Sequence, residues 1–508
     1  MSMMSSGFVH LRRLKPARPS HRERWAPPVH RPRAATFPKP LLIMLTSLFV
    51  VFSAGAQERN AARLVLADSS YVDVALGVNG AAGRMHDVYA PASLLQGMLD
   101  ASSRQKLGHV SLYGRFGYGY EAAKGSTWRG WIDPYETPFM LADSIPGSLS
   151  LERYSMEAGA GLPLGGGWSA GLDLSYDVAL MAKHKDLRNK NTAMNFRVSP
   201  GVYWQAGGFG LGLNLGYERS TERVEYTQIA TNVEHMLFDI YGLWVAHGSG
   251  YASAENRRFK ENNRFFGGFQ FDWSQGSVAL HNDLRASWLR SVQTEVGYNN
   301  QQFGSTRSWT WEDELALTLG PAHEVTASFI FSSMQGFRPL QRQELDPDSR
   351  IRIWVTYGDP VFCYWRQYHV ERLRYRFGPG WKLVVGLENW GVEHSYTEYP
   401  QRFVQRISTL TPSVAVEIPA GRFTLIPEVG YAYDYNAYTD NTSWQLTEPL
   451  LRQWDYWEGN GYHAAFDLRW SAPGGRTYIR AHYDVEASTR LDDDGLRHTA
   501  ALTVGFVF

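Results

Sequence analysis

The feature that most constrains how this chain can fold is an alternation of apolar and polar side chains with a period of two residues. The alternation is clearest over residues 168–180, 209–218 and 500–508. In the first segment every even-numbered residue from Trp168 to Leu180 is apolar, and the residues between them are small or polar. Because successive side chains of a strand point to opposite faces, each segment is typical of a β-strand with one apolar and one polar face.

Short clusters of Gly and Pro divide the chain after residue 107 into pairs of strands. Seven tight turns lie at 163–167, 206–208, 274–276, 320–323, 378–380, 419–421 and 473–475. Longer connections follow at about 122–148, 182–191, 223–263, 292–306, 338–364, 394–402, 436–460 and 488–495. Seven turns join fourteen strands, and a first strand at 107–121 and a last at 496–508 give sixteen, with fourteen as the alternative. Short turns on one side and long loops on the other predict an all-β, antiparallel transmembrane barrel with periplasmic turns and extracellular loops.

Aromatic side chains support this interpretation, because they gather beside turns that were located from Gly and Pro alone. The tryptophans next to tight turns and on the apolar parity are Trp168, Trp204, Trp273, Trp381 and Trp470. Such a set predicts an aromatic girdle at one membrane interface. The alternative is a soluble β-sandwich or solenoid, in which the same alternation would face a core; a sandwich would have to protect the edges of its sheets, whereas a closed barrel has no edges.

Composition excludes several other classes of protein. Lys plus Arg and Asp plus Glu are both 50, so the chain has no overall basic field for nucleic acid. Beyond residue 56 no apolar run approaches the ~18 residues that a membrane helix needs, which excludes a helical multispan protein. Cys363 is the only cysteine, so it cannot form an intrachain disulfide or a thiolate metal site.

The N-terminal region is expected to be an export signal. A basic, proline-rich stretch precedes the apolar run Leu41 to Phe52, and Ala54 and Ala56 supply the small residues of an A-x-A site. Cleavage after Ala56 would make Gln57 the first mature residue. The predicted organisation is therefore a cleaved leader at 1–56, a lead-in at 57–106 that could lie in the lumen, and a barrel at 107–508.

Several motifs resemble known outer-membrane barrels. The last strand, ending in Phe506 and Phe508, looks like the terminal signal that the barrel-assembly machinery recognises. More narrowly, the chain resembles an uncharacterised barrel family of Bacteroidota. The motifs that carry this likeness are Trp128-Arg129-Gly130, Asp133-Pro134-Tyr135-Glu136-Thr137-Pro138, Tyr241-Gly242 and Phe265-Phe266-Gly267-Gly268. The resemblance implies a location and a fold, and brings no substrate or catalytic residues with it.

The parity opposite the apolar one is rich in charge and should face the lumen. The principal candidates are Arg115, Arg197, Asp283, Arg285, Arg372, Arg374, Arg376, Arg480, His482 and Asp484. The arginines before residue 378 form a basic stripe that could attract anions inside a pore. The alternative is that arginines and carboxylates pair across strands and simply fill the lumen.

An enzyme or a metal site has weaker support. The nearest catalytic grouping is His482-Tyr483-Asp484 with Ser488, and such short combinations arise by chance. The run Asp492-Asp493-Asp494-Gly495 is expected to be a solvated turn rather than a cation site. We therefore expect no catalytic residues, no metal and no cofactor.

The long loops 223–263 and 338–364 could fold inward to constrict a pore or outward to meet a partner. The apolar part at 232–246 is expected to be buried, against the lumen wall or as an extension of the preceding strand. The prediction is a channel or substrate-specific transporter in the bacterial outer membrane. A non-conducting surface barrel whose loops bind a partner is the second reading, and an outer-membrane hydrolase the third. Outer-membrane lipid and the barrel-assembly machinery are the expected partners. The sequence does not identify a small solute or a surface partner.

Overall fold

The computed structural model describes residues 60–67, 69–230, 232–233, 235–251, 257–296, 300–347, 350, 352–398, 401–440, 446–489 and 495–508. All of them belong to one compact unit, Pro38–Phe508. The predicted leader with its cleavage site at Ala54, Ala56 and Gln57, and the acidic run 492–494, lie outside the described residues.

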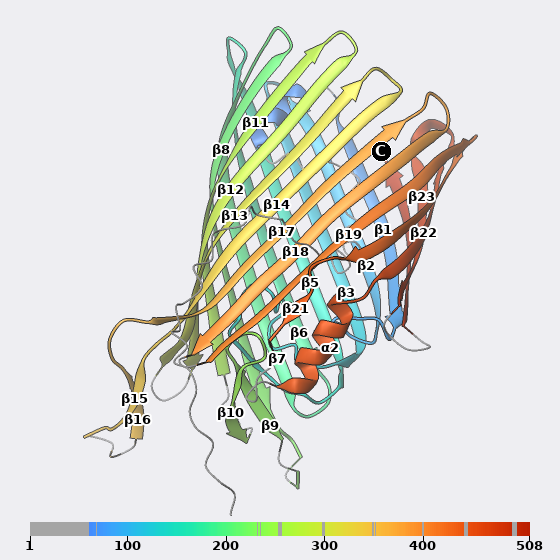
Figure 1. The fold of residues 1–508 in the computed structure, drawn as a ribbon. Coiled ribbons are helices and arrows are strands. Elements are labelled where there is room, and N and C mark those ends of the chain that lie inside the picture. The colour runs from blue at the N-terminus through green and yellow to red at the C-terminus, as the bar shows by residue number, and fades with distance from the viewer. Residues whose placement is uncertain are drawn as a thin grey trace, which may run out of the picture. The chain divides into compact units, whose positions relative to one another are not determined.

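A closed antiparallel barrel of 18 strands forms the body of the structure (Figure 1). Its wall strands are β1 (Tyr71–Gly83), β2 (Ser93–Leu107), β3 (Val110–Ser126), β5 (Gly147–Gly165), β6 (Trp168–Lys183), β7 (Arg188–Ala206), β8 (Phe209–Thr227), β11 (Arg257–Gln275), β12 (Val278–Val296), β13 (Gln301–Leu319), β14 (His323–Arg338), β17 (Val361–Phe377), β18 (Lys382–Glu398), β19 (Gln401–Ala420), β20 (Phe423–Asp434), β22 (Gly461–Ser471), β23 (Thr477–Ser488) and β24 (Leu496–Val507). Each wall strand pairs with the wall strands before and after it in the chain.

The barrel closes where the last strand meets the first. β24 pairs with β1 from Asp73↔Val507 to Gly83↔Arg497. Val72 and Phe508 exchange two backbone hydrogen bonds, of 3.1 and 2.8 Å, beyond the end of that ladder. This closure removes the free edges that β1 and β24 would otherwise expose.

The predicted counts of sixteen and fourteen strands are therefore wrong. All sixteen expected strands are present, and the two further strands, β1 and β2, lie in the segment 57–106 that was interpreted as a lead-in. β1 does alternate from Tyr71 to Val78, but this short stretch is surrounded by small and polar residues, and the alternation of β2 is weak. The turn that joins β2 to β3 contains only Gly108 and His109, with Gly108 at a φ of 61°, and this short signal was missed.

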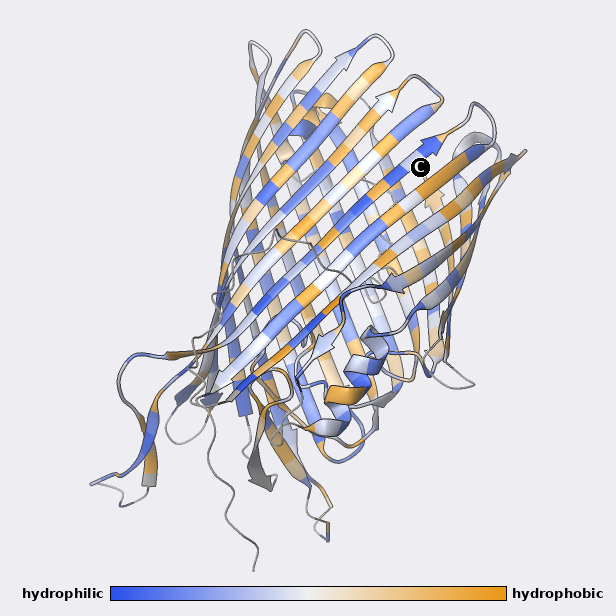
Figure 2. Ribbon diagram, viewed as in Figure 1, coloured by the Kyte–Doolittle hydropathy of each residue, from blue (hydrophilic) through white to orange (hydrophobic). Residues whose placement is uncertain are grey.

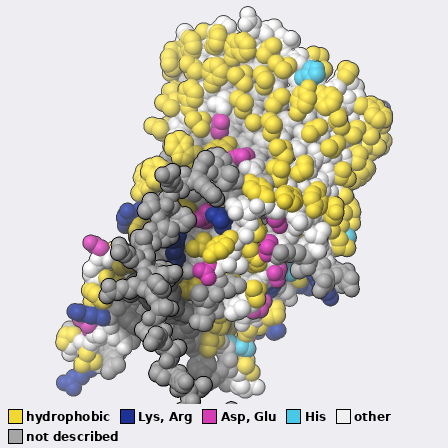
Figure 3. Space-filling view, viewed as in Figure 1, with side chains coloured by type: hydrophobic (Ala, Val, Ile, Leu, Met, Phe, Trp, Pro, Cys, Tyr) yellow, Lys and Arg dark blue, Asp and Glu magenta, His cyan; other side chains and the backbone are white. Residues whose placement is uncertain are grey.

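The outer face of the wall is apolar on the turn side and charged on the loop side. Along β8 the outward residues are apolar from Phe209 to Tyr217 and then include Arg219, Arg223 and Glu225. Figure 2 shows the alternation along the wall strands, and Figure 3 shows a broad hydrophobic zone on one face of the barrel. The five tryptophans predicted for the girdle, Trp168, Trp204, Trp273, Trp381 and Trp470, all lie within three residues of a tight turn.

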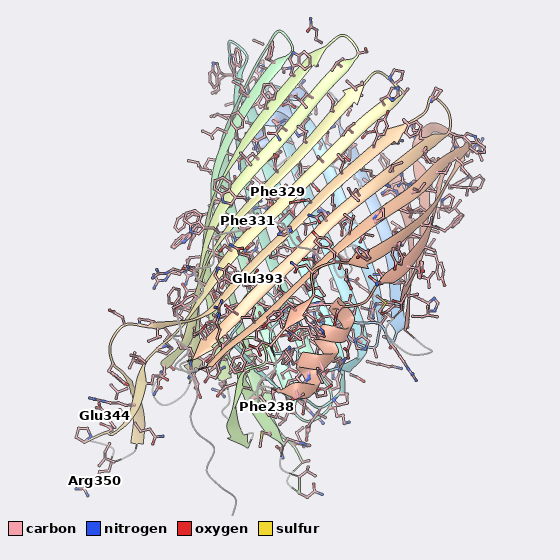
Figure 4. All side chains as sticks on the ribbon, viewed as in Figure 1. Phe238, Phe329, Phe331, Glu344, Arg350 and Glu393 are labelled. Carbon is pink, nitrogen blue, oxygen red and sulfur yellow. The ribbon has the colours of Figure 1, made fainter. Side chains whose placement is uncertain are left out.

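Smaller elements occupy the connections between wall strands. They are β4 (Met140–Ala142), β9 (Met236–Ile240), β10 (Ala246–Tyr251), β15 (Gln341–Leu345), β16 (Arg352–Thr356), β21 (Tyr438–Thr439), the α-helix α2 (Thr447–Trp457) and the 3-10 helices η1 (Ala61–Leu66) and η2 (Pro473–Gly475). The order β10-β9-β4 makes a small sheet, and β15 and β16 make a hairpin. Figure 4 shows this hairpin, marked by Glu344, extending away from the barrel. Within the described part of the chain, no helix has the length and apolarity needed to cross a membrane.

Glycines in the wall allow the segment 60–66 to lie against the inside of β5, β6 and β7. A Cβ atom at Gly171 would come within 2.1 Å of the backbone nitrogen of Ala62, and one at Gly201 within 2.2 Å of Asn60 Oδ1. Asn60 Nδ2 donates to Val202 O at 3.1 Å, and the Ser169 hydroxyl donates to Ala62 O at 2.7 Å. The absence of side chains at these glycines is therefore what seats η1 in the lumen.

Replacing Gly171 with Val should displace residues 60–66 from the wall, because the new side chain would occupy the position of the Ala62 backbone. We expect faster amide exchange over residues 60–67 in hydrogen–deuterium exchange mass spectrometry, with the thermal midpoint of the barrel unchanged. Gly97→Val is the matched control, since a Cβ at Gly97 meets nothing within 4 Å. Unchanged exchange at 60–67 in the Gly171 variant would show that η1 is not held by this contact.

Candidate functional site

The lumen contains a cavity of about 1560 Å³, which we call the chamber. Its wall comes from β1–β3 and from strands between β6 and β24, and its lining also includes Arg63 of η1. On the loop side the lining includes Met85 and Asp87 from the β1–β2 connection, and Tyr456 and Trp457 from α2. The chamber is thus an internal space between the loop side and the turn side of the barrel.

Inward-folded connections close the loop side of the chamber. We call this group the plug, and it consists of residues 84–92, 127–146, β9–β10 and 446–460. One apolar cluster joins Trp131, Trp244 and Leu450 of the plug to Val224 and Tyr226 on β8. Further clusters bury plug residues against lumen-facing residues of β14 and β17–β19. The plug therefore packs against opposite parts of the wall, as expected for a tightly packed protein interior.

Helix α2 is one of the two parts of the plug that line the chamber. Leu450, Trp454 and Trp457 recur at intervals of four and three residues, and all three are buried. This spacing places them on one face of the helix. Trp457 packs edge-on against Trp390 of β18, with ring centroids 6.5 Å apart. The Trp244 indole donates to Gln453 Oε1 at 2.7 Å, which ties α2 to the β9–β10 segment.

The apolar segment at 232–246 lies within this plug. Leu237 and Val245 are fully buried, and Trp244 is almost so. The expectation that this segment is buried is confirmed for Leu237 to Val245, whose side chains are buried or half-buried, but it is wrong for Val233 and Met236, which are exposed. It forms β9 and the start of β10 in a separate small sheet, so it is not an extension of the preceding wall strand.

A buried ionic cluster fixes the first long loop to the wall. Lys260 Nζ lies 2.8 Å from Glu136 Oε2 and 3.0 Å from Glu222 Oε2. Glu222 Oε1 also accepts hydrogen bonds from the Ile132 backbone N–H and from Asn191 Nδ2, both at 2.7 Å. Every member of this cluster thus has a partner, as a buried charge requires.

The charge state of Glu136 follows from its two opposing surroundings. Burial by itself raises the pKa of this carboxyl, but the nearby Lys260 ammonium and Arg264 outweigh burial, so the pKa of Glu136 lies below its usual value. Asp87 differs, because its burial dominates and raises its pKa even though the Tyr135 hydroxyl donates to it. The loop at 127–146 is therefore held by an ionised carboxylate at Glu136.

Most of the charged residues predicted to face the lumen do line the chamber. Nine of the ten candidates are among its lining residues: Arg115, Arg197, Asp283, Arg285, Arg372, Arg374, Arg480, His482 and Asp484. The tenth, Arg376, shares their face but lies nearer the turn, where it pairs with Glu324 at 2.9 Å and Glu417 at 2.6 Å. Period-two alternation alone was sufficient to predict that these ten side chains face the lumen.

The basic stripe on β17 is paired with carboxylates. Arg372 lies 3.2 Å from Glu388, and Arg374 lies 3.8 Å from Glu428. Elsewhere in the lumen Arg115 pairs with Asp100 at 2.7 Å, and Arg197 with Asp173 at 3.0 Å. These contacts favour the reading in which lumen charges satisfy one another over an uncompensated anion-attracting stripe.

The catalytic grouping considered for β23 is not assembled. His482 Nδ1 lies 2.8 Å from Asp467 Oδ1 on the neighbouring strand. Ser488 is six residues further along the same extended strand, which separates the two by ~20 Å. The described residues also contain no group of three His, Cys, Asp or Glu side chains that could hold a metal ion.

Several chamber and plug residues were missed by the sequence reasoning. In the chamber they include Asp73, Asp100, Asp173, Glu388 and Glu428. Asp173 could have been found, because it lies on the polar parity of the clearest alternating segment. The ionic cluster of Glu136, Glu222 and Lys260 could not, because it joins a loop to two strands far away in sequence.

Replacing Glu136 with Gln should loosen the loop at 127–146, because it leaves Lys260 with one fewer counter-charge in a buried site. Breaking such a pair costs about 3–5 kcal/mol. In the unaltered chain the carboxylate's contribution is present above its ordinary pKa of 4.5 and is lost as the pH falls through its lower folded-state pKa. We expect rapid proteolysis within 127–146 at acid pH for the unaltered chain, and at neutral pH as well for Glu136→Gln.

Glu448→Gln is the matched control, because Glu448 is 65% exposed and pairs with Arg452 only at 3.9 Å. It should leave cleavage at 127–146 unchanged at every pH. A Glu136 variant that resists cleavage like the unaltered chain would show that the ionic cluster does not hold the loop.

Comparison with known proteins gives a family and a set of distant structural likenesses. No curated protein matches the chain. Similar solved structures include the ferric preacinetobactin receptor BauA of Acinetobacter baumannii, with 8% identity, a TM-score of 0.42, and 87% of this chain and 80% of that chain covered. They also include the outer membrane transporter YddB of Escherichia coli, with 8% identity, a TM-score of 0.42, and 86% and 81% covered. Similarity of this degree does not indicate a shared ligand. The model of the family of unknown function DUF6850 matches residues 61–508, and the chain belongs to that family.

Proposed function

We propose that this chain is an outer-membrane β-barrel that takes up a small solute through a gated lumen, with its turns in the periplasm and its plug at the cell surface. The apolar outer face supports membrane insertion, because a closed barrel leaves no unpaired backbone groups in lipid. The tryptophans beside the turns, such as Trp168 and Trp381, suit one interface of the bilayer. Phe506 and Phe508 lie at the end of the closing strand, which is consistent with a terminal assembly signal.

The observation that carries this proposal is the position of the chamber behind the plug. A barrel of about 16–18 strands without a plug leaves an aqueous channel. Here aromatic packing on α2 and the ionic cluster at Glu136 obstruct the loop side. A solute could reach the chamber from outside only after the plug moves, so a substrate-specific transporter fits better than an open channel.

The lining of the chamber supports a polar solute that carries charge. It contains eleven carboxylates and nine arginines. The carboxylates are Asp73, Asp87, Asp100, Asp173, Asp283, Glu314, Glu388, Glu428, Asp467, Asp484 and Glu486. Their near balance with arginine favours a solute with both donor and acceptor groups over a simple anion.

The motifs in the first loop and at 238–268 support assigning this barrel to Bacteroidota.

Loss of the aromatic contacts of α2 should open the barrel to ions. Trp454 and Trp457 bury α2 against the wall, and truncating each large side chain in a packed core costs about 3–5 kcal/mol. We expect no open-pore conductance for the unaltered protein in a planar bilayer, and stepwise conductance for Trp454→Ala/Trp457→Ala. Trp381→Ala, on the exposed outer face, is the control and should stay closed. If the double variant shows no conductance, the result would favour the alternative hypothesis of a non-conducting surface barrel.

The open double variant also allows the chamber charges to be tested. With eleven carboxyl groups and nine arginines in its lining, the open pore should select only weakly between cations and anions. Adding Arg372→Gln and Arg374→Gln removes two positive charges and the partners of Glu388 and Glu428, so the reversal potential in a KCl gradient should shift toward that of potassium. Arg342→Gln, on the β15–β16 hairpin, should not change it. An unchanged potential in the Arg372/Arg374 variant would show that ions do not pass through the chamber.

A further inference from the structure

The outer face of β12 and β13 carries two arginines that face each other without a counter-charge. Arg290 and Arg307 are directly opposite in the β12–β13 register, and both are exposed. Residues opposite each other in an antiparallel pair have Cα atoms about 5 Å apart. In the part of the chain that the structure describes, neither guanidinium forms an ion pair or a hydrogen bond. Like charges directly opposite each other destabilise a sheet, so this pair needs an explanation.

An aromatic ladder lies one row below the two arginines, on the turn side. Tyr217, Phe265, Trp288 and Trp309 follow one another across β8, β11, β12 and β13, with successive ring centroids 5.1, 6.2 and 6.4 Å apart. All four share the outward face with the apolar band. Large aromatic rings in such a row are typical of the boundary between lipid tails and headgroups.

The surroundings of the two arginines favour an anion. Arg307 lies over the Phe337 ring at 5.2 Å, which orients its guanidinium. Gln335, the next residue along the row on β14, is exposed and offers a further donor. Glu261 is the carboxylate nearby on β11, and it is engaged by Arg219 at 3.2 Å. Figure 3 shows Lys and Arg side chains on the loop side of the hydrophobic zone.

We propose that Arg290 and Arg307 bind the headgroup phosphate of a membrane lipid, in the leaflet at the loop side, with the aromatic ladder against its acyl chains. Two adjacent guanidinium groups suit a phosphate, because each can donate two parallel hydrogen bonds. The site rests on the proposed membrane insertion but is separate from the chamber and the plug. It explains why two cations are held together just beyond the apolar band.

The test measures lipid retained by the detergent-purified protein in native mass spectrometry. The probes are lipid A, lipid A without its phosphates, and inorganic phosphate. We expect one phosphorylated lipid to be retained, with affinity reduced about tenfold or more in Arg290→Gln/Arg307→Gln and for the dephosphorylated lipid. Arg342→Gln, on the hairpin that extends away from the barrel, should retain lipid normally. Equal retention by the double variant, equal binding of the dephosphorylated lipid, or displacement of the lipid by millimolar inorganic phosphate would overturn the proposal.

A second readout keeps the test decisive if the double variant folds poorly. Because the two arginines repel each other, Arg307→Gln alone should raise the thermal midpoint in lipid-free detergent, and lipid A should stabilise only the unaltered chain. A lower midpoint for Arg307→Gln would mean that the stacked arginine serves the wall itself and would overturn the lipid site. Flotation with vesicles tests membrane insertion separately, since its failure would affect every variant alike.

Discussion

Pairing of every strand edge is the constraint on which the rest of this structure depends. The ladder between β24 and β1 joins the two ends of the wall, and without it one edge of each strand would be left with unpaired backbone groups. Closure also fixes what each face of the wall must do. Alternate side chains then point either into a shared interior or outward, so one parity becomes apolar and the other polar along every strand.

A closed wall of 18 strands encloses more space than its own side chains fill. The long connections fill part of this space, because they carry tryptophans and other apolar side chains whose exposure to water would be unfavourable. Trp131 and Trp244 are buried in the plug, and so is the apolar face of α2. Folding the loops inward buries these apolar side chains and divides the lumen. The chamber is the space left between the plug and the turns.

In the described part of the chain, many charged side chains inside the lumen are paired with opposite charges, whereas two arginines on the outer face are not. Inside, arginines such as Arg372 and Arg197 meet carboxylates on neighbouring strands, which reduces the cost of holding them away from bulk water. Outside, just beyond the apolar band, Arg290 and Arg307 are neighbours with no such partner among the described residues. An external anion could neutralise the second set, whereas the first set already has its counter-charges within the protein.

The sequence by itself indicated the strand class, sixteen of the eighteen wall strands, the turns between them, and many of the residues that face the lumen, because period-two alternation and Gly/Pro turns are local signals. It did not identify β1 and β2 as wall strands, because the alternation of β1 ends at Val78 among small residues and that of β2 is weak. Only the tertiary structure decided the closure of β24 on β1, the folding of α2 into the lumen, and the cluster of Glu136, Glu222 and Lys260. These contacts join residues far apart in the chain, and no local pattern can specify which distant partner will complete a buried charge or an open edge.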